Sequence, residues 1–181
     1  MKKKVVVGLG NPGKEYEETY HNVGYLALEK IVSELSPAPD NSFTNTNQWE
    51  NHKKVFEYID GGDVVFVRPL TFMNESGKAV REALKKFNAK KDALIVIHDD
   101  SDLTLGNIKT SFARGAAGHK GVQSIIDALG TNEFQRIRIG IRPPAEKRRQ
   151  KAGEFALKKI TAVHKKILKE VWNDVLRALT A

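Results

Sequence analysis

The residues best suited to chemistry lie together near the start of the chain, between Asn11 and Asn22. A single imidazole, His21, stands there in a polar segment that also holds Tyr16. A neutral imidazole can take a proton from water near pH 7, and side-chain amides can hold a carbonyl group or a water molecule. Because the chain contains no cysteine, this set suits the splitting of an ester or amide by water rather than redox chemistry.

A histidine base needs a partner on its other ring nitrogen to fix the tautomer. The best placed carboxylate is Asp99, after the apolar run ALIVIH, and Asp100 and Asp102 compete with it for this role. These acidic residues could instead form a turn or a cap. The group HDDSD could also bind a divalent metal through oxygen ligands, but the sequence contains no second acidic cluster to complete such a site, so we expect no metal.

Two further segments could contact a substrate. In FMN, Asn74 can offer its amide to a substrate carbonyl or water, or it can cap the helix that follows, a role that Ser76 could also fill. Met73 can fill the core or face a substrate. The segment GAAGHKG at 115–121 precedes a helix, so its free N–H groups and Lys120 suit a phosphate or carbonyl, although a tight turn explains it equally well.

The glycines of GLGNPG at residues 8–13 match the G-x-G-x-x-G fingerprint of dinucleotide binding. That motif requires a helix that begins within the glycines and faces a pyrophosphate. Here Pro12 separates the last two glycines, and the polar stretch KEYEETYHN follows them. We therefore expect these glycines to serve a sharp turn and a close approach of the backbone to a substrate.

Alternating strand and helix patterns must position these residues. Short apolar runs predict strands at 5–9, 55–59, 64–67, 93–97, 108–112 and 134–141. Apolar residues at helical spacing predict helices at 22–35, 77–87 and 118–129. The strand at 93–97 is expected to end at the acidic group that follows it. The pattern predicts an α/β protein with a single domain over residues 1–181, which ends in a basic segment and a helix at 145–181.

Charge is distributed unevenly along the chain. The net charge is +8, and residues 101–181 hold 16 Lys and Arg against 7 Asp and Glu, so the whole excess lies in this part. A one-sided basic field favours a polyanionic partner such as nucleic acid, or it is a solvated surface that keeps the protein soluble. With no signal-peptide pattern and no apolar run of roughly 18 residues, we expect a cytoplasmic protein that does not enter membranes.

Several segments, taken in order, resemble bacterial peptidyl-tRNA hydrolase: GLGNPGKEYEETYHNVGY, RPLTFMNESGKAV, HDDSDLTLGNIK and GHKGVQSIIDALGTNEFQRIRIGI. They cover about residues 4–144, and GEFAL with the final helix resembles the family's last segment. The resemblance implies a mixed, twisted central sheet flanked by helices. It also implies hydrolysis of the ester between a peptide and the 3′-terminal ribose of tRNA. We expect peptidyl-tRNA as partner, no cofactor, no metal and a monomer.

The resemblance also implies roles for individual residues. His21 is the general base that activates water, and Asp99 orients it. Asn11 and Asn74 hold water and the peptide backbone near the scissile ester. Two residues help to shape the cleft, namely Tyr16 and Met73.

For tRNA, the resemblance implies that Arg138 clamps the 5′-phosphate. Ser111 stands where a basic clamp residue is often found, and Lys109 is a candidate to replace it. Lys120 stands where the family has a substrate-contacting asparagine, so that role does not transfer directly, and we count Lys120 among the substrate-binding residues. The alternative function is that of a relative that binds RNA without hydrolysing it; the presence of both His21 and Asp99 favours the enzyme.

Overall fold

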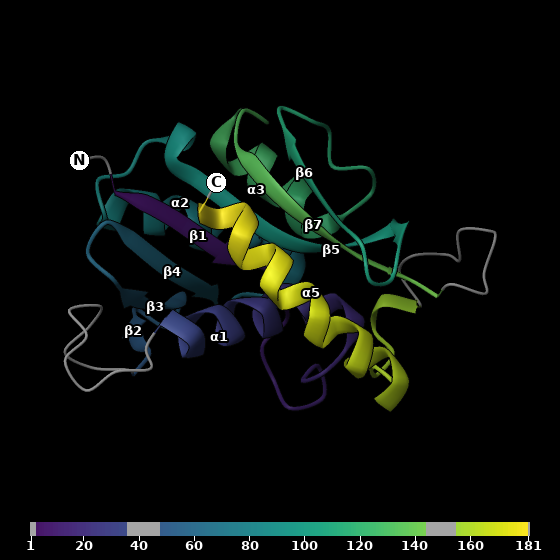
Figure 1. Cartoon of the computed structure of the whole chain (residues 1–181). Helices are drawn as coiled ribbons and strands as arrows, with labels where there is room; N and C mark the ends of the chain where they lie inside the picture. Colours follow the sequence, from purple (N-terminus) through teal and green to yellow (C-terminus); the bar gives the residue numbers. More distant parts are fainter. Residues whose placement is uncertain (1–2, 36–47, 144–154, 181) are drawn as a thin grey trace.

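A computed structural model describes residues 3–35, 48–143 and 155–180 of the chain. The predicted basic segment lies, from residue 145 to 154, outside the described residues. Within the described part, every strand joins one sheet, in the order β2-β3-β4-β1-β5-β7-β6 (Figure 1). The strands are β1 (Lys4–Gly8), β2 (Glu50–His52), β3 (Phe56–Asp60), β4 (Val64–Pro69), β5 (Leu94–Thr104), β6 (Ile108–Phe112) and β7 (Gln135–Arg142).

The centre of the sheet is parallel and its edges are antiparallel. β1 pairs in parallel with β4 and β5, and β5 pairs in parallel with β7. β3 and β6 run antiparallel to their neighbours. Because parallel strands are covered on both faces, β1 reads as a continuous apolar run, with Val6 in one core and Val5 and Val7 in the other.

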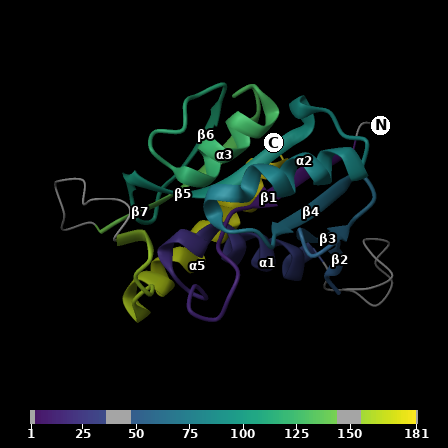
Figure 2. The ribbon, with the colours of Figure 1, turned by 180° about the vertical axis from the view of Figure 1, so that it is seen from behind.

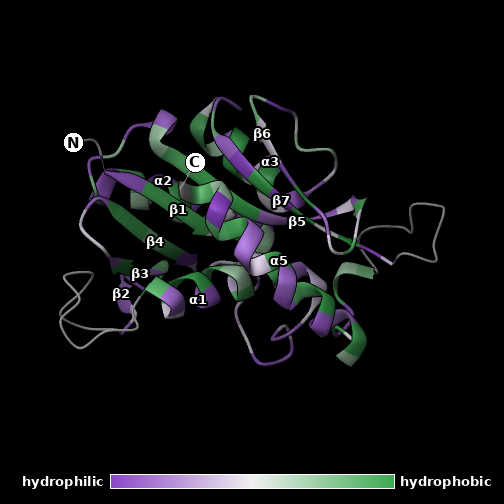
Figure 3. Ribbon diagram, in the orientation of Figure 1, coloured by the Kyte–Doolittle hydropathy of each residue, from purple (hydrophilic) through white to green (hydrophobic). Residues whose placement is uncertain are grey.

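Helices cover both faces of this sheet. α1 (Val23–Leu35) and α5 (Ala162–Thr180) lie on the face seen in Figure 1. α2 (Ser76–Lys86) and α3 (Lys120–Leu129) lie on the opposite face, which Figure 2 shows from behind. In α5 the hydrophobic residues alternate with hydrophilic ones along the ribbon (Figure 3), and its buried members include Leu168, Val171 and Val175. The predicted α/β class, with a mixed sheet flanked by helices, is confirmed.

Two expectations about element ends were wrong. β5 does not end at the acidic group, because β7 continues to pair with it, with Asp99 opposite Ile139, until a register shift between Asp100 and Thr104. The N-cap of α2 is Glu75, and its side chain makes no capping hydrogen bond, so neither Asn74 nor Ser76 has this role. A short 3₁₀ helix, η2 (Met73–Glu75), leads directly into α2 and replaces the side-chain cap.

Two glycines at the end of β1, Gly8 and Gly10, allow close packing against α1. A Cβ at Gly8 would lie 2.4 Å from the carbonyl oxygen of Gly24, and a Cβ at Gly10 would lie 2.6 Å from the ring of Tyr25. Both distances are far below van der Waals contact, so these glycines let α1 cross the end of β1 closely. Packing against α1 thus explains both glycines, and the expected approach of the backbone to a substrate stays a prediction. No helix in the described part of the chain is long and apolar enough to cross a membrane.

Candidate active site

A cleft of about 1130 Å³ opens near the carboxyl ends of β1 and β5 and the start of α3. Sites commonly form at these strand ends in open α/β sheets. All of the site residues predicted from the sequence line this cleft: Asn11, Tyr16, His21, Met73, Asn74, Asp99, Lys109, Lys120 and Arg138. The fold thus brings together side chains from segments that are up to 127 positions apart, from Asn11 to Arg138.

His21 and Asp99 are in direct contact. His21 lies in a 3₁₀ turn, η1 (Tyr20–Asn22), between β1 and α1, and its Nδ1 lies 2.9 Å from Asp99 Oδ1. Burial lowers the pKa of His21, but the charge and hydrogen bond of Asp99 outweigh it, so the pKa is raised above its ordinary value. The nearby ammonium of Lys120 acts in the opposite direction and lowers this pKa.

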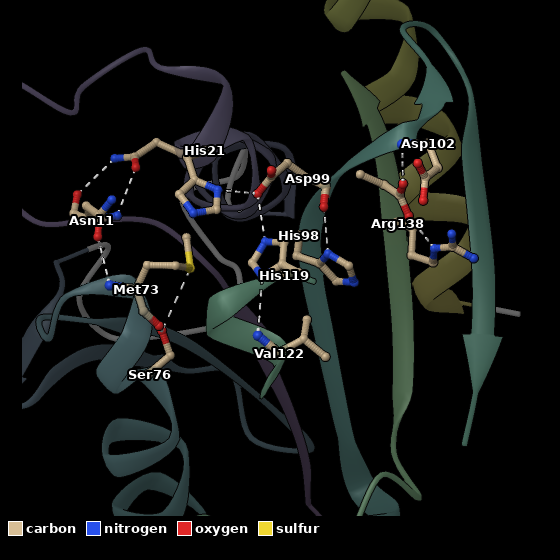
Figure 4. A network of polar contacts seen from close by, with 12 residues as sticks. Asn11, His21, Met73, Ser76, His98, Asp99, Asp102, His119, Val122 and Arg138 are labelled. Atoms are coloured by element: carbon tan, nitrogen blue, oxygen red, sulfur yellow. Dashed lines mark hydrogen bonds and ion pairs between the residues drawn. The ribbon is translucent and has the colours of Figure 1, made fainter. Parts of the chain in front are cut away.

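A second histidine, which the sequence reasoning missed, shares the same carboxylate. His119 Nε2 lies 2.9 Å from Asp99 Oδ1, and its ring centroid lies 5.0 Å from that of His21 (Figure 4). Burial raises the pKa of Asp99, but the two imidazoles lower it more strongly, to well below its ordinary value. Asp99 is therefore an ionised acceptor between two ring N–H donors.

The tautomer of His119 follows from its place in the fold. It is the N-cap of α3, and its Nδ1 accepts a hydrogen bond from the backbone N–H of Val122 at 3.2 Å. A nitrogen that accepts carries a lone pair, so the proton of a neutral ring is on Nε2 and is donated to Asp99. The expectation of a single imidazole at the site was wrong. The sequence does carry one sign of His119: this histidine stands directly before an apolar helical pattern, which is the position of an N-cap.

The remaining ring nitrogen of His21 is the chemically available one. Its Nδ1 donates to Asp99, so a neutral ring has its lone pair on Nε2. Figure 4 shows this nitrogen on the side of the ring that faces Met73. A neutral imidazole held in this way can take a proton from a water molecule in the cleft.

The three groups His21, Asp99 and His119 also have the composition of a metal site. Their ligand atoms lie within 4.8 Å of one another. For His119 Nε2 to bind a metal, the proton would have to move to Nδ1, where it would face the N–H of Val122. The capping bond thus opposes metal binding through His119. Asp100, the next carboxylate of HDDSD, binds Arg138 instead, at 2.5 Å.

A network of amides fixes Asn11 beside the base. Asn11 Oδ1 accepts from the backbone N–H of Met73 at 2.7 Å, so its Nδ2 remains as the donor of that side chain. Asn22, which the sequence reasoning left without a role, holds the backbone of Asn11 through two hydrogen bonds of 2.8 and 2.9 Å. Asn74 is exposed on η2 at the rim of the cleft.

Aromatic and basic side chains form the walls. Tyr16 contacts Phe72 edge to face, with ring centroids 6.3 Å apart, and Phe72 is 51% exposed although it is large and apolar. Across the cleft, Lys109 on β6 pairs in register with Arg138 on β7. Lys120 begins α3 and is exposed. The site therefore has an apolar wall on one side and cationic residues on the other.

Arg136, two residues from Arg138, is the buried member of this basic group. Its guanidinium donates to the carbonyl of Gly115 at 3.1 Å. Burial lowers its pKa, and the charges of Arg138 and Arg114 lower it further, whereas Asp100 raises it. Several arginines thus meet near one carboxylate, which leaves this part of the cleft strongly positive and suited to an anionic ligand.

Comparisons with known proteins agree on one family. A family model described as peptidyl-tRNA hydrolase matches residues 5–181. The peptidyl-tRNA hydrolase of Aquifex aeolicus is 35% identical over 176 residues, which cover 97% of this chain and 88% of that protein. The peptidyl-tRNA hydrolase of Enterococcus faecalis is 44% identical over 144 residues, covering 79% and 73% of the two chains. The crystal structure of peptidyl-tRNA hydrolase from Acinetobacter baumannii superposes with a TM-score of 0.79 at 29% identity and covers 97% of this chain and 85% of that one.

Proposed function

Because this chain belongs to the peptidyl-tRNA hydrolase family, we propose that His21 is the general base of the ester hydrolysis and that Asp99 orients it. The enzyme cleaves the ester between peptide and tRNA. One observation carries the proposal: Asp99 Oδ1 lies 2.9 Å from a ring nitrogen of both His21 and His119. Because Nδ1 of His21 is bound to Asp99, the lone pair on Nε2 is the one that can take a proton from water.

In the first step, His21 Nε2 removes a proton from a water molecule while the water oxygen attacks the carbonyl carbon of the ester. The ring becomes an imidazolium, and the adjacent Asp99 carboxylate stabilises that charge. Because the pKa of Asp99 is held far below neutrality, the carboxylate keeps its charge and does not take the proton itself. His119 keeps Asp99 in place from the other side.

Attack by water places a negative charge on the former carbonyl oxygen, which must be stabilised by hydrogen-bond donors. Asn11 is suited to this task, because the bond to Met73 fixes its amide and leaves Nδ2 to donate. Asn74 lines the same cleft and supplies a further donor to the oxyanion or to the peptide backbone, and Lys120 lies there as a cation for the bound tRNA. Tyr16 and Met73 shape the wall against which the peptide lies.

In the second step, the tetrahedral intermediate collapses. The bond between the carbonyl carbon and the ribose oxygen breaks, and the imidazolium of His21 returns its proton to that oxygen. The products are a peptide with a free carboxylic acid, which releases its proton to solvent and becomes a carboxylate, and a tRNA with a free terminal hydroxyl. The base is regenerated in its neutral form, so atoms and protons balance without a further group.

The cationic wall is the proposed binding surface for tRNA phosphates. Arg138 and Lys109 are neighbours in register on adjacent strands, so one phosphate can contact both. Asp100 holds the Nε side of Arg138 and thereby orients the guanidinium, whose other nitrogens remain to bind a phosphate oxygen. The excess positive charge of residues 101–181 adds a field that attracts RNA.

We place this activity in the cytoplasm, where tRNA is used in translation, and expect the enzyme to act as a monomer. The described cleft holds the base, its carboxylate and the amides within one chain, so catalysis needs no residue from a second copy. Light scattering during size-exclusion chromatography would test the oligomeric state. A mass of about twice the chain mass of 20.2 kDa would contradict it.

Hydrolysis in ¹⁸O-labelled water tests the proposed reaction. With tRNA carrying an N-acetylated amino acid, turnover should place the label in the carboxylate of the released acyl group and leave the tRNA hydroxyl unlabelled. Activity should also survive treatment with EDTA, provided that the magnesium needed to fold the tRNA is restored before the assay. Tight binding of this substrate without turnover would instead favour the non-catalytic RNA-binding relative.

A further inference from the structure

The segment that carries His21 has little regular structure of its own. Residues 14–18 between β1 and η1 form consecutive turns, and Glu18 adopts a left-handed backbone conformation with φ of 57°. The hydrogen bonds within this segment are local, such as that from Thr19 Oγ1 to the carbonyl of Tyr16 at 2.8 Å. Such a loop needs support from elsewhere to hold a catalytic ring in one position.

That support comes from the other end of the chain. Thr19 forms an isolated antiparallel bridge with Lys159, some 140 residues away. Hydrogen bonds on either side of the bridge run from Tyr20 N to Lys158 O at 3.2 Å and from Ile160 N to Glu18 O at 2.8 Å. Lys165, in the first turns of α5, adds an ion pair to Glu18 at 2.7 Å. The segment before α5 and the start of α5 therefore dock onto the loop that precedes His21.

Tyr20 is the deepest contact of this docking. It is 2% exposed, and its ring stacks on Phe155 with centroids 4.5 Å apart and planes 25° apart. Its hydroxyl lies 2.5 Å from Nδ1 of His164, on α5. Burial raises the pKa of Tyr20, and hydrogen bonds with Thr161 lower it by a smaller amount. The hydroxyl therefore keeps its proton and can donate to His164.

The three residues of η1 thus have three different anchors. Tyr20 is bound by His164 and Phe155, His21 by Asp99, and Asn22 by the backbone of Asn11. Because η1 has only three residues and the hydrogen-bond geometry of a 3₁₀ turn is poorer than that of an α-helix, its orientation depends on these outer contacts. A rotation of the turn about the Tyr20 side would displace the adjacent imidazole.

We propose that Tyr20, held by its hydrogen bond to His164, is a positioning residue that keeps the His21 ring at the angle required to take a proton from water. The inference rests on the proposed role of His21 as general base. By this inference α5 contributes to the chemical step through His164, although no described residue of α5 lines the cleft. A displacement of about 1 Å in a catalytic group can lower the rate about 10²-fold. Loss of the hydrogen bond between Tyr20 and His164 can therefore produce a measurable decrease in rate.

The first test is Tyr20→Phe, which removes the hydroxyl and keeps the stacked ring. We expect kcat on N-acetyl-aminoacyl-tRNA to fall about 10-fold, with KM unchanged, because substrate contacts are not touched. Tyr58→Phe is the matched control: Tyr58 is also buried, on β3, and its hydroxyl donates to Glu50 at 2.5 Å. The control loses a similar hydrogen bond far from His21 and should keep kcat within about twofold of wild type, since the reacting groups are unmoved.

The second test uses His164. His164→Ala should lower kcat to the level of Tyr20→Phe, whereas His164→Asn should restore much of it, because its side-chain oxygen can accept near the position of Nδ1. In the double variant Tyr20→Phe/His164→Ala the two decreases in kcat should not add, since both substitutions remove the same hydrogen bond. The ¹⁵N chemical shifts of the His21 ring should move in Tyr20→Phe and not in Tyr58→Phe.

Three results would overturn the inference: an unchanged kcat in Tyr20→Phe, equal losses in Tyr20→Phe and Tyr58→Phe, or additive losses in the double variant. These results are separable from failure of the proposed function. If His21→Ala remains active, His21 is not the base; if His21→Ala is inactive and Tyr20→Phe is fully active, the base stands and the positioning role falls. Circular dichroism at the assay temperature confirms that each variant is folded.

Discussion

The Nε2 atom of His119 lies 2.9 Å from Asp99 Oδ1 while its Nδ1 caps α3, so one ring links the start of a helix to the carboxylate that also binds His21. The cap fixes the ring proton on Nε2 and thereby makes His119 a donor to Asp99. A helix terminus and an active site are built from the same side chain. Changes at this position should therefore affect stability and rate separately, according to which bond they retain.

The variants His119→Asn and His119→Ala separate these effects. Asparagine is a good N-cap but is too short to reach Asp99, so His119→Asn should keep the cap, lose only the stability that the hydrogen bond to Asp99 contributes, and lower kcat about 10-fold. His119→Ala should show the same loss of rate and, in addition, lose about 1 kcal/mol of the free energy of unfolding. Urea unfolding and steady-state hydrolysis measure the two quantities. A fully active His119→Asn variant would show that the bond to Asp99 has no part in catalysis.

The raised pKa of His21 predicts a pH dependence with a definite sign. A general base acts in its neutral form, so kcat/KM should fall as the pH drops through the pKa of His21, which Asp99 raises above the ordinary value of about 6.5. In Asp99→Asn the remaining influences, burial and Lys120, both lower this pKa. The acidic limb of the profile should move to lower pH, and the plateau should fall because the ring is less well oriented. If the acidic limb of Asp99→Asn stays at the pH of the wild-type limb, a group other than His21 titrates there.

Lys120 should act on substrate binding and on the pKa of His21. It begins α3, where a cation is unfavourable to the helix dipole unless an anion lies between them, and we infer that bound tRNA supplies this anion. Lys120→Glu should raise KM several-fold with a small change in kcat, and it should move the acidic limb of kcat/KM to higher pH. Lys120→Asn, which offers both a donor and an acceptor, should be tolerated.

The control for Lys120→Glu is Lys85→Glu, the same charge reversal at an exposed position near the end of α2. Because Lys85 does not line the cleft, its KM and pH profile should match those of wild type. If Lys120→Glu behaves like this control, the ammonium of Lys120 points into solvent.

Arg138 should control the salt dependence of tRNA binding. Removal of one phosphate contact should reduce the slope of log affinity against log salt by about 1. Arg138→Ala leaves Asp100 buried without its partner, so Arg138→Ala/Asp100→Asn is the better variant for folding and should show the same loss of affinity. Full-length tRNA should be weakened more than a minimal 3′-terminal fragment. Equal weakening of both substrates would assign Arg138 a structural role only.

Much of the fold was predictable because local patterns determined it. The apolar runs at β1, β4 and β7 and the helical spacing at α1 and α3 were read correctly, and Gly130 ends α3 in a left-handed conformation as a C-cap glycine does. The extension of β5 to Thr104 was not predictable, because acidic residues disfavour strands and the pairing with β7 is a tertiary interaction.

For the site, residue types and strand ends indicated His21, Asp99 and the amides, and the fold brings them to one cleft. The second imidazole was missed because nothing local distinguishes a capping histidine that also reaches a carboxylate 20 residues away. The bonds of Asn22 to Asn11 and of Tyr20 to His164 likewise depend on long-range packing. Sequence patterns thus indicated the groups that we propose to react but not the residues that hold them.

The most direct test of the account is the rate of tRNA release by His21→Ala, compared with His52→Ala. His52 lies on β2, outside the cleft, so the control carries the same substitution without touching the site. Loss of the general base should lower kcat about 10²–10⁴-fold, with tRNA binding nearly intact, while His52→Ala should match wild type. Hydrolysis by His21→Ala at a rate near that of wild type would contradict the account.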